Sequence, residues 1–139
     1  MFRLPVPRVP VLRPLAAALA AGLIAVTASA ATPERETELM AIAASCAAFY
    51  QAGFDRLGLP VERNEAQRQA FIRVVDALAV RHLPKPQREP WFMEHVVDRT
   101  AIVVNIIDLE PDAAVPKVRA NLGACDALLP EMNAAAGLE

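Results

Sequence analysis

The sequence has few of the residues from which catalytic and metal sites are built. Its 139 residues include two cysteines and two histidines, and neither H-E-x-x-H nor C-x-x-C occurs. A zinc site needs three or four converging ligands and a c-type haem needs C-x-x-C-H, so we expect no metal ion and no cofactor. No Ser-His-Asp set or pair of catalytic carboxylates can be assigned, so we expect no catalytic residue. The sequence favours a non-enzymatic protein.

Glycine and positive charge are also scarce. Five glycines leave few loops that could cradle a phosphate group, and no P-loop motif is present. Three of the 14 Lys and Arg residues precede residue 31, whereas all 16 Asp and Glu residues follow it, so residues 31–139 carry a formal net charge of −5. Proteins that hold nucleic acid need clustered positive charge. We therefore expect no nucleic-acid partner.

No apolar run reaches the roughly 20 residues that a membrane span needs. The run over residues 15–26 follows three arginines and precedes Ala28 and Ala30, small residues that signal peptidase accepts. We predict a signal peptide over residues 1–30 and a single helical domain over residues 31–139, located in the periplasm or secreted. After cleavage we expect no stable membrane insertion. The alternative is an uncleaved anchor, because residues 15–31 could cross a bilayer at a tilt.

The two cysteines, Cys46 and Cys125, are 79 positions apart. In an exported protein with two cysteines and no more, one disulfide is the expected outcome. The alternative is a reactive thiol, which needs a nearby cysteine, histidine or helix N-terminus to lower its pKa. Cys46 lies among alanines in the middle of a helical pattern and has none of these nearby in the sequence. We predict a structural disulfide between Cys46 and Cys125.

Prolines and glycines divide the chain into helical segments. We expect helices over residues 33–57, 64–82, 90–109 and 116–129. Thr32 is placed as the N-cap of the first, Pro33 at its first position, and Gly58 at its end. The second is expected to begin at Asn64, with Gln67 completing a capping box.

The third expected helix ends in "AIVVNIIDL", which is apolar on nearly every face and is typical of a central, well-covered helix. Pro116 cannot lie deep inside a helix without losing a hydrogen bond, so the fourth helix is expected to begin there and the tail 131–139 to fray. Four helices with short connections predict an all-α fold, an up-and-down four-helix bundle with one disulfide.

Two groups of side chains are candidate sites. Four aromatic residues could line a ligand pocket, although apolar core is the simpler interpretation of such a stripe: Phe49, Tyr50, Trp91 and Phe92. A polar cluster interrupts the apolar third segment, where buried polar groups need partners: His95, Asp98, Arg99 and Asn105. The simpler interpretation of the cluster is an intrahelical pair with an arginine stem lying along the surface.

The leading functional hypothesis is a module that acts through contacts with another exported protein. The alternative, from a different class, is a carrier that holds a small ligand in an apolar pocket between helices. A contiguous exposed apolar patch would favour the first hypothesis, and a closed cavity of a few hundred Å³ would favour the second.

Overall fold

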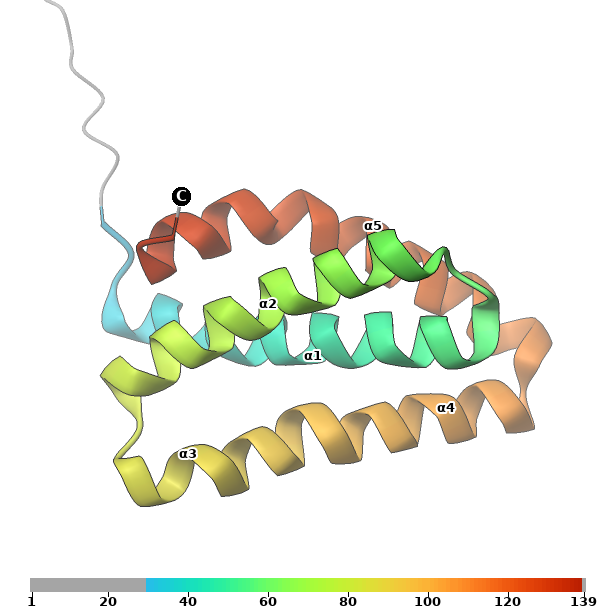
Figure 1. Cartoon of the computed structure of the whole chain (residues 1–139), viewed down its shortest axis with the longest axis horizontal. Coiled ribbons are helices and arrows are strands. Elements are labelled where there is room, and N and C mark those ends of the chain that lie inside the picture. Colours follow the sequence, from blue (N-terminus) through green and yellow to red (C-terminus); the bar gives the residue numbers. More distant parts are fainter. Residues whose placement is uncertain (1–29, 139) are drawn as a thin grey trace, which may run out of the picture.

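The computed structural model describes residues 30–138, which are helical nearly throughout (Figure 1). In order, the elements are α1 Pro33–Leu57, α2 Val61–His82, α3 Lys85–Phe92, the π-helical η1 Met93–Asp98, α4 Arg99–Leu109 and α5 Pro111–Ala136. α3, η1 and α4 follow one another without a break, and we call them together the α3–α4 rod. The described residues therefore form four helices that run alternately in opposite directions, as the all-α prediction requires.

α1 has the bounds expected from the sequence. Thr32 Oγ1 accepts a hydrogen bond from the backbone N–H of Arg35 at 3.2 Å, and Pro33 occupies the first helical position. At the other end Gly58 adopts a left-handed conformation, with φ of 62°, that residues with a side chain rarely adopt.

The predicted start of α2 at Asn64 was wrong, because the helix begins three residues earlier, at Val61. Pro60 precedes the first turn, and its carbonyl accepts the backbone N–H of Asn64 at 3.0 Å. Asn64 is thus inside the helix and buried, so it caps nothing. The capping box with Gln67 does not form either, since the Gln67 side chain donates to Asp126 on α5.

Both later helices are longer than predicted. The α3–α4 rod begins at Lys85 rather than residue 90, and Pro90 lies within it. α5 covers Pro111–Ala136 rather than residues 116–129, with Pro116 and Pro130 inside it. The tail expected to fray is helical because Met132 and Ala136 are buried in the core, and Gly137 caps it with φ of 71°.

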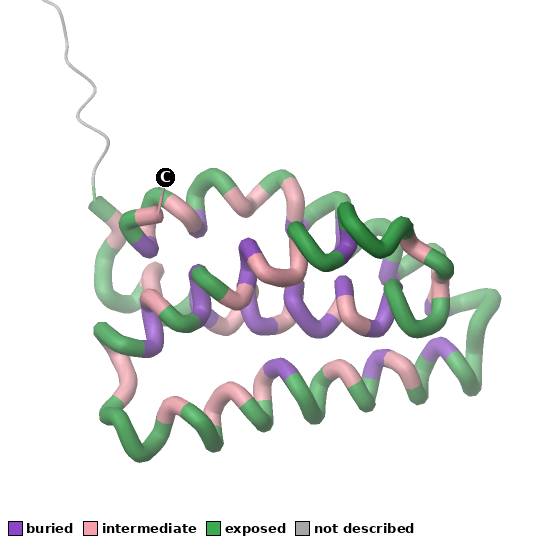
Figure 2. Tube along the Cα trace, viewed as in Figure 1, coloured by how far each residue is buried: buried purple, intermediate pink, exposed green. Residues whose placement is uncertain are grey.

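α1 is the central helix of the molecule. It packs against α2, α5, η1 and α4, and Figure 1 shows it between the α3–α4 rod and the other two helices. Figure 2 shows buried positions along most of its length. Four of its buried residues are Ala43, Ala44, Ala47 and Ala48. Such small side chains let neighbouring helices approach on several sides.

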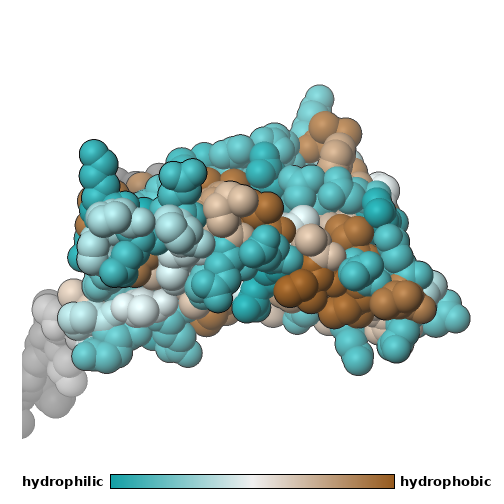
Figure 3. Space-filling view, turned by 90° about the horizontal axis from the view of Figure 1, so that it is seen from below, coloured by the Kyte–Doolittle hydropathy of each residue, from teal (hydrophilic) through white to brown (hydrophobic). Residues whose placement is uncertain are grey.

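The α3–α4 rod was expected to be the covered helix, and that expectation was wrong. The rod contacts α1 through one buried stripe that includes Val96, Val103 and Ile107. Large apolar side chains on the rod remain exposed, and we call them the apolar face: Met93, Val97, Ile102, Ile106 and Leu109. Seen from the side of the rod, apolar surface gathers toward the α4 end (Figure 3).

The disulfide prediction is confirmed. Cys46 on α1 and Cys125 on α5 are bonded, and their Cα atoms lie 5.7 Å apart, within the usual range for a disulfide. Among the described residues no helix combines the length and apolarity that crossing a membrane would need. The predicted signal peptide falls on residues 1–29, which are outside the described part, and on Ala30.

Candidate functional site

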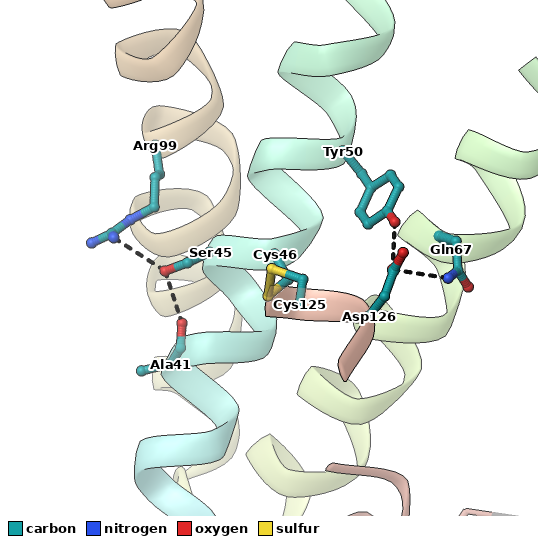
Figure 4. Close-up of a disulfide and its surroundings, with 8 residues drawn as sticks. All are labelled: Ala41, Ser45, Cys46, Tyr50, Gln67, Arg99, Cys125 and Asp126. Carbon is teal, nitrogen blue, oxygen red and sulfur yellow. Dashed lines mark hydrogen bonds between the residues drawn. A yellow bond between two sulfur atoms is a disulfide. The ribbon is translucent and has the colours of Figure 1, made fainter. Parts of the chain in front are cut away.

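A hydrogen-bonded group of three side chains lies beside the disulfide (Figure 4). Tyr50 on α1 donates its hydroxyl proton to Asp126 Oδ1 at 2.5 Å, and Gln67 Nε2 on α2 donates to the same oxygen at 3.0 Å. The Tyr50 ring stacks on Phe71, with 5.8 Å between the ring centroids. Burial and the neighbouring Asp126 carboxylate raise the pKa of Tyr50 far above its ordinary value, so the phenol stays protonated as a donor.

Tyr50 and Asp126 of this group help to line a hollow of about 150 Å³ between α1, α2 and α5. The hollow is lined by Tyr50, Leu59, Pro60, Arg63, Asn64, Leu122 and Asp126. Asn64 is only 3% exposed, and its Oδ1 has no hydrogen-bond partner among the described residues. Buried polar atoms are nearly always hydrogen-bonded, so an unpartnered buried oxygen is unusual.

Arg63 stands at the mouth of the hollow. Its Nη2 lies 3.8 Å from Asp126 Oδ2, which is an ion pair without a hydrogen bond. The Arg63 side chain is 75% exposed, whereas that of Asp126 is 30% exposed. Solvent therefore screens the arginine more strongly than the carboxylate.

Gly53 lies against two residues that line the hollow, Leu59 and Leu122. A Cβ atom at this position would lie 2.8 Å from Leu59 Cδ1 and 3.6 Å from Leu122 Cδ1. The glycine lets Leu59, from the loop between α1 and α2, fold back against α1.

The four aromatic residues of the expected pocket do not line one cavity in the described part of the chain. Tyr50 lines the hollow described above, and Phe92 lines a separate depression of about 210 Å³ between α1, α2 and the α3–α4 rod. Phe49 and Trp91 are half-buried against the core, and the Trp91 ring stacks on His95 at 4.1 Å.

The structure does not join the four residues of the expected polar cluster by any hydrogen bond that it shows among the described residues. His95 Nδ1 lies 2.9 Å from the backbone oxygen of Trp91, and Arg99 donates to Ser45 Oγ on α1 at 3.1 Å (Figure 4). Asp98 and Asn105 are exposed. Within residues 30–138 no group of three or more His, Cys, Asp or Glu side chains is placed to hold a metal ion.

Sequence reasoning missed Arg63, Asn64, Gln67 and Asp126. Asn64 and Gln67 were assigned to a helix cap, and nothing in the sequence marks Asp126 except its position after Cys125. The disulfide is the one signal that could have placed Asp126 near α1. It fixes α5 against α1 one residue away, and Tyr50 is one helical turn after Cys46.

A second polar cluster joins the start of α1 to the end of α2. His82 Nε2 lies 2.6 Å from Glu36 Oε2, and Arg81 Nη1 donates to Glu36 Oε1 at 3.1 Å. Arg81 also donates to the backbone oxygens of Ala135 and Ala136, the last residues of α5. These hydrogen bonds join the start of α1 to the ends of α2 and α5, so we assign the cluster a structural role.

The Glu36 contacts predict a stability that falls in acid. The hydrogen bond from His82, aided by Arg81, holds the pKa of Glu36 below its ordinary value of 4.5. A carboxylate with a lowered folded-state pKa stabilises fully above its unfolded pKa, and this contribution is lost as the pH falls through the folded pKa. Between about pH 6 and about pH 3, the melting temperature of the wild type should therefore fall more than that of Glu36→Gln. Thermal unfolding followed by circular dichroism measures both.

Glu34→Gln is the matched control, because Glu34 is an exposed carboxylate of the same first turn. It should follow the wild type over this pH range. Parallel curves for the wild type and Glu36→Gln would contradict the assignment.

Comparisons of this chain with protein-family models, with curated proteins and with solved structures find no match. Two features of the described residues bear on function. They are the apolar face of the α3–α4 rod and the depression beside Phe92.

Proposed function

We propose that this chain is an exported, non-enzymatic helical module that binds another exported protein through the apolar face. The observation that supports this most directly is the exposure of five large apolar side chains on one rod, with Leu109 77% exposed. Single exposed apolar residues are ordinary, but a group along one helix is typical of an interaction surface.

The arrangement of the α3–α4 rod explains why this face is uncovered. A helix that is apolar around its whole circumference is normally buried on all sides. Here α1 covers only the side that carries Val103 and Ile107, and it leaves the neighbouring side with Ile102 and Ile106 in solvent. Burying one such side chain stabilises a complex by roughly 1.5–3 kcal/mol before the costs of association. A bound partner would bury these exposed side chains.

The charges around the apolar face indicate the chemistry of that partner. From residue 89 to residue 112 the chain has one Lys or Arg residue, Arg99, which donates to Ser45. The same segment has six acidic residues: Glu89, Glu94, Asp98, Asp108, Glu110 and Asp112. Of the six, Asp108 is paired with Arg56 of α1. We therefore propose an amphipathic helix with apolar residues at i, i+3 and i+4 and with flanking Lys or Arg residues.

Photo-crosslinking in the intact cell tests this proposal. Replacing Ile106 with p-benzoylphenylalanine should give, on irradiation, an adduct with another exported protein whose crosslinked segment is a basic amphipathic helix. The double variant Ile102→Gln, Leu109→Gln in the same background should reduce the adduct yield about tenfold or more, because it removes two apolar anchors.

The control places the same photoreactive group at Val80, an exposed valine of α2 that lies outside the apolar face. It should give no adduct with that protein. Equal adducts from both positions, or no adduct from Ile106, would contradict the proposed surface. An adduct between two copies of this chain would replace the proposed partner by a homodimer.

A further inference from the structure

We infer that the depression beside Phe92 binds one aromatic ring, which a tyrosine or phenylalanine of the protein partner supplies. This inference rests on the proposed function, because the partner carries the ring. The depression adjoins the apolar face, and Val97 belongs to both. A pocket at an interaction surface is where a partner anchors a large side chain, and such anchors are often aromatic.

The depression forms because α2 and the α3–α4 rod diverge over α1. α2 packs against α3 near the loop that joins them, and the two then separate toward the α4 end of the rod (Figure 1). Ala47 of α1 lines the depression but is fully buried, so it lies beneath the surface that a ligand would touch. Its small side chain does not fill the space between α2 and the rod, and a volume of about 210 Å³ remains.

The side of the depression formed by the rod is apolar and accessible. Phe92 and Thr100 are half-buried there, and Val97 is 43% exposed. The Thr100 hydroxyl donates its proton to the backbone oxygen of Val96 at 2.7 Å, so it has no proton left for a ligand. An apolar cavity of about 150 Å³ holds one benzene molecule, so the depression has room for a ring and the methylene group that links it to a backbone.

Arg68 of α2, which also lines the depression, favours an aromatic ring over an aliphatic side chain. Its Nε and Nη2 atoms donate to the Glu65 carboxylate at 3.2 Å and 2.9 Å. With these edge groups engaged, the flat face of the guanidinium group remains for stacking, and the π-electrons of a ring attract the cation. The same positive charge disfavours Lys or Arg in the depression, so the basic residues of the partner would lie outside it, near the acidic residues of the rod.

Two small probes of similar size test the preference for a ring. p-Cresol reproduces the tyrosine side chain, and trans-4-methylcyclohexanol has the same carbon skeleton without π-electrons. NMR of the Val97 methyl groups and of the Arg68 Nε–H group follows the titration of the purified protein. p-Cresol should give saturable shifts with a dissociation constant about threefold or more below that of the cyclohexanol. Equal dissociation constants, or shifts of the Ile102 methyl groups as large as those of Val97, would overturn the inference.

Replacing Arg68 by lysine tests the stacking contact, because lysine keeps the positive charge and lacks the flat guanidinium group. Arg68→Lys should weaken p-cresol binding about threefold or more. Arg73→Lys is the matched control, since Arg73 is an exposed arginine of the same helix that does not line the depression. It should leave p-cresol binding unchanged. Wild-type affinity in Arg68→Lys, or equal weakening in both variants, would overturn the inference.

The photo-crosslinking assay connects the depression to the partner. With p-benzoylphenylalanine at Ile106, Arg68→Lys should lower the adduct yield about threefold, and Arg73→Lys should leave it unchanged. An unchanged yield in Arg68→Lys would overturn the inference but not the proposed function, because the adduct itself would still show that the apolar face is bound. No adduct before either arginine is replaced would contradict the proposed function, and the inference would fail with it even if p-cresol binds.

Discussion

Replacing Cys46 and Cys125 together by alanine is expected to lower the free energy of unfolding by roughly 2–5 kcal/mol, which is a large share of the stability of a single domain. The bond joins α1 to α5 across 79 positions of sequence, so it closes a long loop in the unfolded chain. Both residues also lie in the core, each 5% exposed or less. Urea unfolding of the oxidised wild type and of the double variant measures the difference.

The reduced wild type is the control, because it keeps both sulfur atoms and loses only the bond. If the cross-link carries the effect, the reduced protein should be nearly as unstable as the double variant. Cys46→Ala alone should leave Cys125 as a free thiol and give disulfide-linked dimers on non-reducing gels. Two free thiols in the unfolded wild-type protein, or equal stability of its oxidised and reduced forms, would contradict this account.

The features that the sequence predicted well depend on residues close together in the chain. The ends of α1 follow from Thr32 and Gly58, which act on backbone groups within one turn. On α2 four apolar residues recur at helical spacing in the sequence, and all four are buried: Phe71, Val74, Val75 and Leu78. The disulfide followed from the number of cysteines and the expected compartment. Each of these inferences needed no knowledge of how the helices pack.

The helix boundaries that failed involve prolines and distant contacts. Three prolines lie just before a helix or in its first turn: Pro60, Pro86 and Pro111. A proline costs little there, because the backbone N–H that it lacks would have no partner within the helix. These helices can therefore begin earlier than expected. The end of α5 depends instead on packing. Met132 is buried in the core, and Arg81 of α2 bonds the carbonyls of the last turn.

The hollow beside Tyr50 could be predicted only in part. The sequence marked Tyr50 as a candidate pocket residue. A buried tyrosine hydroxyl usually has a hydrogen-bond partner, and in the structure that partner is Asp126. That partner lies 76 positions away, and Gln67 lies 59 positions from the same carboxylate. Which side chains meet across three helices depends on the axial offset and rotation of each helix, and local patterns leave both undetermined.

The choice of the central helix was wrong because apolarity is a poor guide to coverage when side chains differ in size. The segment "AIVVNIIDL" is more apolar than α1, but its branched side chains keep neighbouring helices at a distance. α1 is rich in alanine and can be approached closely by α2, α5 and the α3–α4 rod. Close approach on several sides requires small side chains, as interiors are packed at nearly crystalline density.

This interpretation predicts a large penalty for enlarging an alanine of α1. Ala43 is fully buried, so Ala43→Leu adds three carbon atoms where no solvent-accessible space remains. Overpacking of this kind costs typically about 1–3 kcal/mol, and a position enclosed by several helices should lie at the upper end of that range. Leucine favours helices nearly as well as alanine, so the loss would come from packing and not from helix propensity.

Ala124→Leu on α5 is the matched control, because Ala124 is an exposed alanine inside a helix next to the disulfide. It should change the free energy of unfolding by less than about 0.5 kcal/mol, as surface substitutions usually do. Urea unfolding of both variants under oxidising conditions makes the comparison. Equal stability of the two leucine variants would mean that α1 is not closely packed at Ala43, and the explanation of the central helix by its small side chains would then fail.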